Sequence, residues 1–310
     1  MRVLRSALPL VLFMATGADC APAQSSTEST RLVNVGGYPT RVVELGVRDR
    51  EAGEPVLVLL AGAGSPLETW QGWLSDVADL APVVSYDRPG IGGSTFDELE
   101  ASPAHMVEHA HAVLAALSIS PPYVLVGHSW GGTLALHYAG RYPREVVGVV
   151  YLDPFDPMEP PRPESGSRVP PGANFPPGLR AEAEAIQTFQ DTPIEDRSLP
   201  PDPDVPTGVL LGTRIPTGQG PPPWTPAYWN DWMTQRLARY AQLVRGRRDG
   251  TLIIASDAGH FVHHDVPALA TDLVRTVLEA ARERYIHPGA AGLTAPSHEL
   301  NWATSSRDFL

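Results

Sequence analysis

The stretch that decides the fold is Gly127-His128-Ser129-Trp130-Gly131-Gly132, in which a serine has glycines close on both sides. Residues 123–126 before it are apolar and partly β-branched, which predicts a buried parallel strand. Residues 133–139 after it are rich in helix formers. Ser129 is therefore expected in a sharp strand-to-helix turn, where the crowded backbone requires small neighbours and the hydroxyl stands off the end of the sheet.

This position favours a reactive serine. The N-terminus of the following helix carries a partial positive charge, which would stabilise an oxyanion that develops beside Ser129. The Gly-x-Ser-x-Gly pattern alone occurs by chance, and it becomes specific only with a strand before it and a helix after it. The alternative interpretation is a structural turn whose serine has no chemical role.

The rest of the chain alternates between strand and helix patterns, which predicts an α/β fold with a mostly parallel sheet covered by helices on both faces. An antiparallel hairpin is expected to open the chain, and residues 67–80 are expected to form one helix that buries Trp70 and Trp73. The expected strands are residues 32–35, 41–47, 56–60, 83–86, 123–126, 146–152, 208–212 and 251–255.

One insertion interrupts the predicted core. Proline and glycine punctuate the sequence after residue 154, and only residues 179–189 there have a helical pattern. This insertion is interpreted as a cap or lid over the sheet. The predicted division is a linker at 24–30, a core at 31–154 and 206–286, a cap at 155–205 and a disordered tail at 287–310.

The N-terminus has the features of a secretion signal. Arg2 and Arg5 precede a short apolar run at residues 8–14, and Ala21-Pro22-Ala23 offers small residues at the positions that a signal peptidase reads. A signal peptide over residues 1–23 is therefore predicted. It would place the mature protein outside the cytoplasm, secreted or periplasmic, with no stable membrane insertion after cleavage.

Composition excludes several classes of function. The formal net charge of −12 argues against nucleic acid as a partner. Cys20 is the only cysteine, so no intramolecular disulfide can form. A lipid anchor at Cys20 stays open, although Asp19 is a poor residue for that signal. The sequence has no phosphate loop, Rossmann fingerprint or metal-binding cluster, so we expect neither a cofactor nor a metal.

A serine hydroxyl is a poor nucleophile near neutral pH and needs a base, for which histidine is well suited. His260 is the main candidate, because it lies in the loop after the last expected strand, at the carboxyl edge where ligands gather. The other candidates are weaker. His263 and His264 lie where the next helix should begin, and His128 flanks Ser129 in a turn that points it away from the hydroxyl.

At this point the sequence resembles the α/β-hydrolase superfamily, over about residues 42–284. The resemblance rests on the serine turn at 127–131, on Asp87-Arg88-Pro89-Gly90-Ile91-Gly92-Gly93-Ser94, on the glycine loop after residue 60, and on Gly259-His260-Phe261. It implies an α/β-hydrolase fold with a cap, in which Ser129 is the nucleophile and His260 is the base. Asp87 and Arg88 look structural in this family and are expected to hold their turn.

The resemblance also implies an oxyanion hole made of backbone N–H groups, those of Ala63 and Trp130. This chain departs from the family pattern at Ala61-Gly62, where many members have His-Gly. A backbone donor survives this change because it needs no side chain. Each such donor is worth about 10²–10³ in rate.

The third member of the catalytic triad is predicted to be Asp153. In most members the acid follows the next strand, but here no carboxylate follows residues 208–212 before Asp231, which lies within an expected helix. Some members place the acid after the preceding strand, where this chain has Asp153 and Asp156. Asp153 directly ends its strand, so the sheet would hold it near His260. Asp156 is the alternative acid, and a simple turn aspartate before proline is the other interpretation of Asp153.

Together these features predict a secreted serine hydrolase that cleaves a carboxylic ester, or a related acyl bond, through an acyl-enzyme intermediate. Serine at this position excludes family members with an aspartate nucleophile, the haloalkane dehalogenases and epoxide hydrolases. A non-hydrolytic small-molecule receptor and a cofactor-free acyl transferase or perhydrolase are the alternatives on the same fold. The expected partner is a small-molecule acyl substrate, and an apolar or aryl group is favoured by aromatic residues expected to overhang the site: Phe155, Phe175, Phe189 and Trp224.

Cleavage after Ala23 would make Gln24 the first residue of the mature protein. We expect N-terminal sequencing of protein from a secreting host to begin there, with a cut near Ala18 as the other site that small residues allow. An exported protein that still begins with Met1 would contradict the signal peptide.

Overall fold

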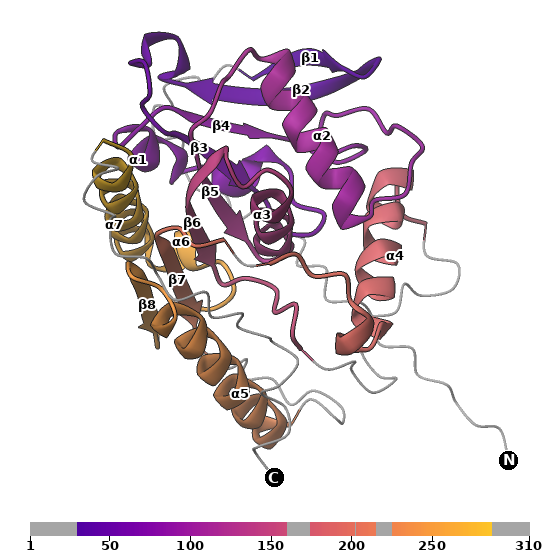
Figure 1. The fold of residues 1–310 in the computed structure, drawn as a ribbon. Helices are drawn as coiled ribbons and strands as arrows, with labels where there is room; N and C mark the ends of the chain where they lie inside the picture. The colour runs from indigo at the N-terminus through magenta and orange to yellow at the C-terminus, as the bar shows by residue number, and fades with distance from the viewer. Residues whose placement is uncertain (1–29, 160–173, 202, 215–224, 287–310) are drawn as a thin grey trace, which may run out of the picture.

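One sheet organises the computed structural model, which describes residues 30–159, 174–201, 203–214 and 225–286 (Figure 1). Its strands are β1 Arg31–Val35, β2 Tyr38–Leu45, β3 Val56–Leu60, β4 Val83–Tyr86, β5 Tyr123–His128, β6 Val146–Leu152, β7 Thr207–Gly212 and β8 Gly250–Ala255. They lie in the order β1-β2-β4-β3-β5-β6-β7-β8. β2 is antiparallel to β1 and β4, and the other neighbours are parallel. The predicted α/β sheet with an antiparallel opening hairpin is confirmed.

Helices cover both faces of this sheet, because successive strand residues point to opposite sides. Val58 and Leu60 of β3 face one core, which includes side chains of α2 and α3, whereas Leu57 and Leu59 face a second core beside α1 and α7. The helices are α1 Leu74–Ala78, α2 Pro103–Ala116, α3 Trp130–Arg141, α4 Pro177–Asp191, α5 Pro226–Arg245, α6 Val262–Asp265 and α7 Pro267–Ile286, with 3-10 turns η1 Val47–Asp49, η2 Leu67–Trp70 and η3 Ile194–Asp196.

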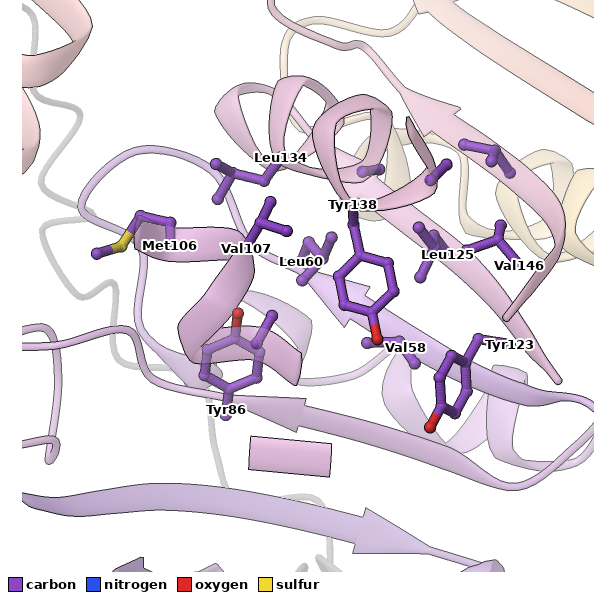
Figure 2. Packing of buried hydrophobic residues seen from close by; sticks show 14 of the residues in the cluster. Val58, Leu60, Tyr86, Met106, Val107, Tyr123, Leu125, Leu134, Tyr138 and Val146 are labelled. Atoms are coloured by element: carbon purple, nitrogen blue, oxygen red, sulfur yellow. The ribbon is translucent and has the colours of Figure 1, made fainter. Parts of the chain in front are cut away.

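Figure 2 shows the first of these cores, where side chains from α2 and α3 meet the strands. The cluster holds Leu134 and Tyr138 of α3 and Val107 of α2, and the strands contribute Leu60 and Leu125. None of these five side chains is more than 3% exposed. Burying each aliphatic side chain stabilises the fold by about 1.5–3 kcal/mol relative to exposure. The helix that follows Ser129 is therefore fixed to the sheet along its length.

The single helix predicted over residues 67–80 is wrong. The structure has η2 and then α1, and the break falls at Gly72, whose φ of 82° lies in the left-handed region that favours glycine. The burial predicted for the two tryptophans is confirmed, since Trp70 is 0% exposed and Trp73 is 1% exposed. Their indole N–H groups donate to the Ser85 and Thr271 hydroxyls, at 3.1 and 2.9 Å. The short helix α6 contains His263 and His264, where a helix was expected to begin.

Between β6 and β7 the described residues include α4 and η3. The predicted cap boundaries stay a prediction, since residues 160–173 and 202 lie outside the described residues. The predicted signal peptide, the linker up to residue 29 and the tail at 287–310 also lie outside them. Within the described segments, no helix has the length and apolarity needed to cross a bilayer.

Candidate active site

The structure places Ser129 between β5 and α3, with β5 ending at His128 and α3 beginning at Trp130. The backbone angles of Ser129, φ 52° and ψ −123°, lie in a region that non-glycine residues rarely adopt. Two hydrogen bonds hold this turn. Ser129 N donates to Leu152 O at 3.2 Å, and Phe155 N donates to Ser129 O at 2.9 Å. The strained turn is therefore fixed by the end of β6 and the segment that follows it.

Close backbone contacts around Ser129 explain its glycine neighbours. A Cβ on Gly131 would lie 1.9 Å from Leu60 O, and a Cβ on Gly127 would lie 2.5 Å from Gly131 O. A Cβ on Gly62 would lie 3.1 Å from Ser129 Cβ. The loop after β3 thus passes directly beside the serine, where a side chain on Gly62 would crowd His128 and Ser129.

His260 and Asp153 meet at the same edge of the sheet as Ser129. Asp153 follows β6 directly, and His260 lies in the loop between β8 and α6. His260 Nδ1 lies 2.7 Å from Asp153 Oδ2. An ionised carboxylate only accepts hydrogen bonds, so Nδ1 donates, and the tautomer of the neutral ring that fits this contact has no proton on Nε2. The His260 side chain is 50% exposed, whereas that of Asp153 is 7% exposed.

The Asp153 carboxylate is buried and charged. Its Oδ1 accepts hydrogen bonds from Arg236 Nη1 at 2.9 Å and from Gly212 N at 3.0 Å. Burial raises the pKa of Asp153, but the Arg236 cation and the His260 hydrogen bond outweigh it, so the net pKa lies below its usual value. An ionised Asp153 at neutral pH would stabilise positive charge on His260.

Asp156, the alternative acid, has different partners. Its Oδ2 accepts from Arg239 Nε at 2.6 Å, and its Oδ1 accepts from Met158 N at 2.9 Å. None of the contacts found among the described residues joins Asp156 to His260. The geometry therefore favours Asp153 as the partner of the imidazole.

His128 links the serine turn to the His260 loop. The two imidazole rings lie 4.7 Å apart, and His128 Nε2 lies 2.9 Å from the His260 carbonyl oxygen. A carbonyl only accepts, so Nε2 of His128 carries the proton. Burial, reinforced by the neighbouring His260 and His263, lowers the pKa of His128 well below its usual value. His128 is therefore a neutral side chain that holds the backbone of the His260 loop.

No hydrogen bond from Ser129 Oγ to the His260 ring is found in the described part of the chain. Such bonds are often long in a hydrolase without substrate and shorten when substrate binds. The remaining rivals, His263 and His264, are engaged elsewhere, because each places Nε2 against Thr69 O, at 3.0 and 2.7 Å. Of the candidate bases, His260 is the one that contacts a carboxylate at the carboxyl edge of the sheet.

Arg236 is a site residue that the sequence reasoning missed. It lies in the middle of α5, is 2% exposed, and donates from Nη2 to Pro154 O at 2.7 Å. Its guanidinium also lies 5.0 Å from the ring of Trp232 and 5.7 Å from that of Tyr240. The sequence did contain a signal for this residue, since an arginine lies beside the apolar stripe of the helix. A cation buried there requires an anionic partner. The sequence does not say which carboxylate that partner is.

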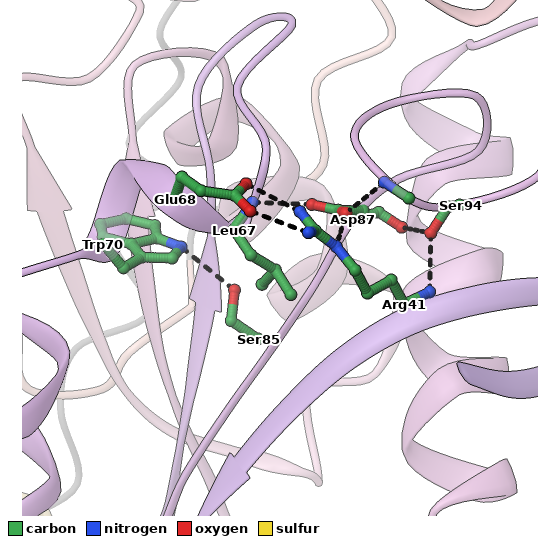
Figure 3. A network of polar contacts seen from close by, with 8 residues as sticks. Arg41, Leu67, Glu68, Trp70, Ser85, Asp87 and Ser94 are labelled. Carbon is green, nitrogen blue, oxygen red and sulfur yellow. Dashed lines mark hydrogen bonds and ion pairs between the residues drawn. The ribbon is translucent and has the colours of Figure 1, made fainter. Parts of the chain in front are cut away.

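Asp87 holds the turn after β4, as expected, and also reaches the loop after β3. Figure 3 shows Asp87 between Arg41 and Leu67. Asp87 Oδ1 accepts from Leu67 N at 2.7 Å, and Oδ2 accepts from Gly93 N at 2.8 Å and from Arg41 Nε at 2.5 Å. Arg41 continues the network to Glu68, with two contacts of 2.7 and 2.8 Å. A fully buried carboxylate thus joins β2, β4 and η2.

The proposed oxyanion donors come from two segments, the start of α3 and the loop after β3. Trp130 is the first residue of α3, so its N–H has no partner within the helix. Ala63 is exposed and lies in the loop after β3, one residue beyond Gly62. Arg88 reaches this loop as well, although it was expected only to hold its own turn.

Two of the aromatic residues expected to overhang the site, Phe155 and Phe189, pack on Trp130. Phe155 and Phe189 lie edge-on to Trp130, with ring centroids 5.4 and 5.5 Å away. Trp130 is 1% exposed, so these rings extend the core above the serine turn. Phe175 is partly buried, and Trp224 lies outside the described residues.

A small cavity near this site is not an acyl pocket. It has a volume of about 50 Å³, is lined by residues that include Gly132, Phe155 and Tyr240, and does not reach Ser129 or His260. Such a volume holds water molecules rather than a substrate. In the described segments, no group of three or more His, Cys, Asp or Glu residues is arranged to hold a metal ion.

Comparison with known proteins agrees with this fold. Residues 55–289 match the family model for the alpha/beta hydrolase fold, which covers more than half of the chain. The chain therefore belongs to the α/β-hydrolase family, and its relatives include proteins named as hydrolases.

Three similar proteins illustrate the relationship. An uncharacterized protein of Bacillus subtilis, YqjL, is 33% identical over 32% of this chain and 39% of its own length. A 2-hydroxy-6-oxo-2,4-heptadienoate hydrolase of Pseudomonas putida is 30% identical over 41% of this chain and 45% of its own. The chain thus spans less than half the length of these curated relatives. The crystal structure of a probable hydrolytic enzyme of Pseudomonas aeruginosa has a TM-score of 0.58 at 18% identity, over 80% of this chain and 93% of its own, which shows the fold alone.

Because burial lowers the pKa of histidine side chains in this protein, we expect the folded state to lose stability in acid. Burial lowers the pKa of His263 to about 3, whereas an unfolded histidine titrates near ~6.5. Between about pH 6.5 and 3 the unfolded state binds more protons, so the free energy of unfolding falls as the pH drops, by up to about 1.4 kcal/mol per pH unit for this group. We expect urea unfolding between pH 7.5 and 4.5 to show this slope, and His263→Gln to reduce it by about that amount.

Ser75→Ala, at an exposed serine of α1 that does not titrate, is the control and should leave the slope close to that of the wild type. A His263→Gln slope equal to the wild-type slope would show that His263 does not couple folding to protons.

Proposed function

We propose that this protein is a serine hydrolase that cleaves carboxylic esters through an acyl-enzyme intermediate. Ser129 is the nucleophile, His260 is the base and Asp153 is the acid that orients the base. The observation that carries the proposal is the 2.7 Å contact between His260 Nδ1 and Asp153 Oδ2, at the edge of the sheet where Ser129 occupies its strained turn. This combination leaves His260 Nε2 unprotonated, which is the state that a general base needs.

In the acylation step, Ser129 Oγ attacks the ester carbonyl carbon and its proton passes to His260 Nε2. The tetrahedral intermediate then breaks its bond to the leaving oxygen, which takes this proton and departs as the alcohol. In the second step, water attacks the acyl-enzyme and gives a proton to His260. Ser129 recovers that proton as the carboxylic acid leaves. Asp153 stays ionised throughout and stabilises the imidazolium.

Backbone N–H groups of Ala63 and Trp130 stabilise the oxyanion in this scheme. The helix that begins at Trp130 adds a partial positive charge at the same point. Such preorganised donors need no rearrangement during the reaction, which is why they are effective. The proximity of the Gly62 backbone to Ser129 supports the choice of the adjoining Ala63.

A small acyl substrate with an apolar or aryl group suits the aromatic side chains of Phe155 and Phe189 next to Trp130. The signal-like residues 1–23 support action outside the cytoplasm, in the periplasm or medium. A chain-length series of p-nitrophenyl esters tests the substrate class. A preference for charged or sugar-bearing esters would reject an apolar site.

Ser129→Ala should abolish turnover of a short p-nitrophenyl ester, with a loss of at least about 10⁴-fold in kcat, because no other group can form the acyl-enzyme. A fluorophosphonate should label the wild type on the peptide that contains Ser129, as identified by mass spectrometry, and should not label the variant. Ser75→Ala, at an exposed serine of α1, is the control and should keep both properties. Stable binding of the ester without turnover would instead indicate a receptor.

Asp153→Asn should lower kcat by about 10⁴, because an amide cannot fix the reactive tautomer of His260 or stabilise its charge. Asp156→Asn is the matched comparison, three residues away and bound to Arg239 instead, and it should change kcat by only a few-fold. Circular dichroism checks that both variants fold. The opposite ranking would make Asp156 the acid, and two active variants would indicate a serine–histidine dyad.

A further inference from the structure

A buried ion pair joins α4 to the loop that carries Ala63. Arg88 Nε lies 2.6 Å from Glu182 Oε1, and both side chains are only 3% exposed. Arg88 follows β4, whereas Glu182 lies on α4 in the segment between β6 and β7. Burial lowers the pKa of Arg88, but the Glu182 carboxylate outweighs it and the net pKa is raised, so the arginine keeps its charge.

The same two side chains also bind the loop backbone. Arg88 Nη1 donates to Ala61 O at 2.7 Å, and Nη2 donates to Gly62 O at 2.5 Å. Glu182 Oε2 accepts from Gly64 N at 2.5 Å. Backbone groups before and after Ala63 are therefore held by one ion pair, and half of that pair belongs to α4.

Contact between backbones makes the position of α4 specific. A Cβ on Gly178, in the first turn of α4, would lie 2.5 Å from Gly90 Cα and 2.7 Å from Pro89 O. Gly90 lies two residues after Arg88 in the same turn. The helix therefore touches the turn that supplies Arg88, and the two contacts fix Glu182 relative to the loop.

We propose that Glu182 is a positioning residue for the oxyanion hole, and that the hole is complete only while α4 is docked on the Arg88 turn. The proposal rests on the hydrolase function proposed above. A buried ion pair is weak evidence for stability, because well-packed apolar side chains often serve as well. It does, however, supply directed hydrogen bonds, which here end on three backbone groups around Ala63. A donor displaced by about 1 Å can lose about 10²-fold in rate.

Two variants of Glu182 separate an effect on the position of the Ala63 loop from an effect on the stability of the fold. Glu182→Asp keeps the charge next to Arg88, but its side chain is one methylene too short to reach both Arg88 and Gly64 N. Glu182→Gln keeps the length and removes the charge, and it could fail to fold because Arg88 is left unpaired. Glu184→Gln is the control on the same helix, because Glu184 is 58% exposed and pairs only loosely with Arg180 among the described residues.

With a short p-nitrophenyl ester, we expect Glu182→Asp to lower kcat by about 10- to 100-fold and to leave KM within a few-fold. A boronate that mimics the tetrahedral intermediate should bind more weakly by a similar factor. Gly178→Ala keeps Glu182 but displaces the start of α4. It should therefore also lower kcat and weaken boronate binding. Glu184→Gln should match the wild type in kcat, in KM and in boronate affinity.

Hydrogen exchange at residues 61–65 gives a readout that does not depend on turnover. These amides should exchange faster in Glu182→Asp than in Glu184→Gln. Faster exchange in Glu182→Asp with unchanged kcat and boronate affinity would overturn the positioning role. Exchange equal to that of Glu184→Gln would overturn it as well. A wild type that does not hydrolyse any ester would reject the proposed function, and the exchange comparison would still decide whether Glu182 orders the loop.

Discussion

The site depends above all on the burial of one charge, the Asp153 carboxylate. A buried carboxylate is costly unless every lone pair has a partner. Here the cost is offset by the Arg236 cation, the Gly212 amide and the His260 imidazole. Because the first two partners occupy Oδ1, Oδ2 is directed at His260. The orientation of the His260 ring thus follows from the contacts that bury the Asp153 charge at the end of β6.

Constraints from the surrounding backbone fix the Ser129 turn in a similar way. Ser129 keeps unfavourable angles because its N–H and C=O are bonded to residues at and after the end of the neighbouring strand, and because the glycines around it let other backbone segments pack closely against the turn. Asp153 also has a positive φ, 41°. Both strained residues follow adjacent parallel strands, so the rigid sheet holds the strain in place and fixes the relative position of the two side chains.

Much of the fold could be predicted because its signals are local. Continuous apolar runs such as residues 146–152 identified the buried strands, and the Gly-x-Ser-x-Gly turn identified the edge where chemistry would occur. The helix over residues 67–80 failed because its apolar spacing continued across Gly72, whose left-handed angle breaks the helix. Periodicity reports which side chains are buried, and it does not report where the backbone changes direction.

The sequence by itself determined the strand order along the chain, the strained serine turn and a short set of acids and bases at one sheet edge. Only the tertiary structure decided which of these groups meet, since Asp153 and His260 are 107 residues apart and Arg236 and Glu182 bind partners that no local pattern names. The physical reason is that hydrophobic periodicity acts over neighbouring turns and strands, whereas buried charges pair by distance in space. Their partners therefore become known only when the chain has folded.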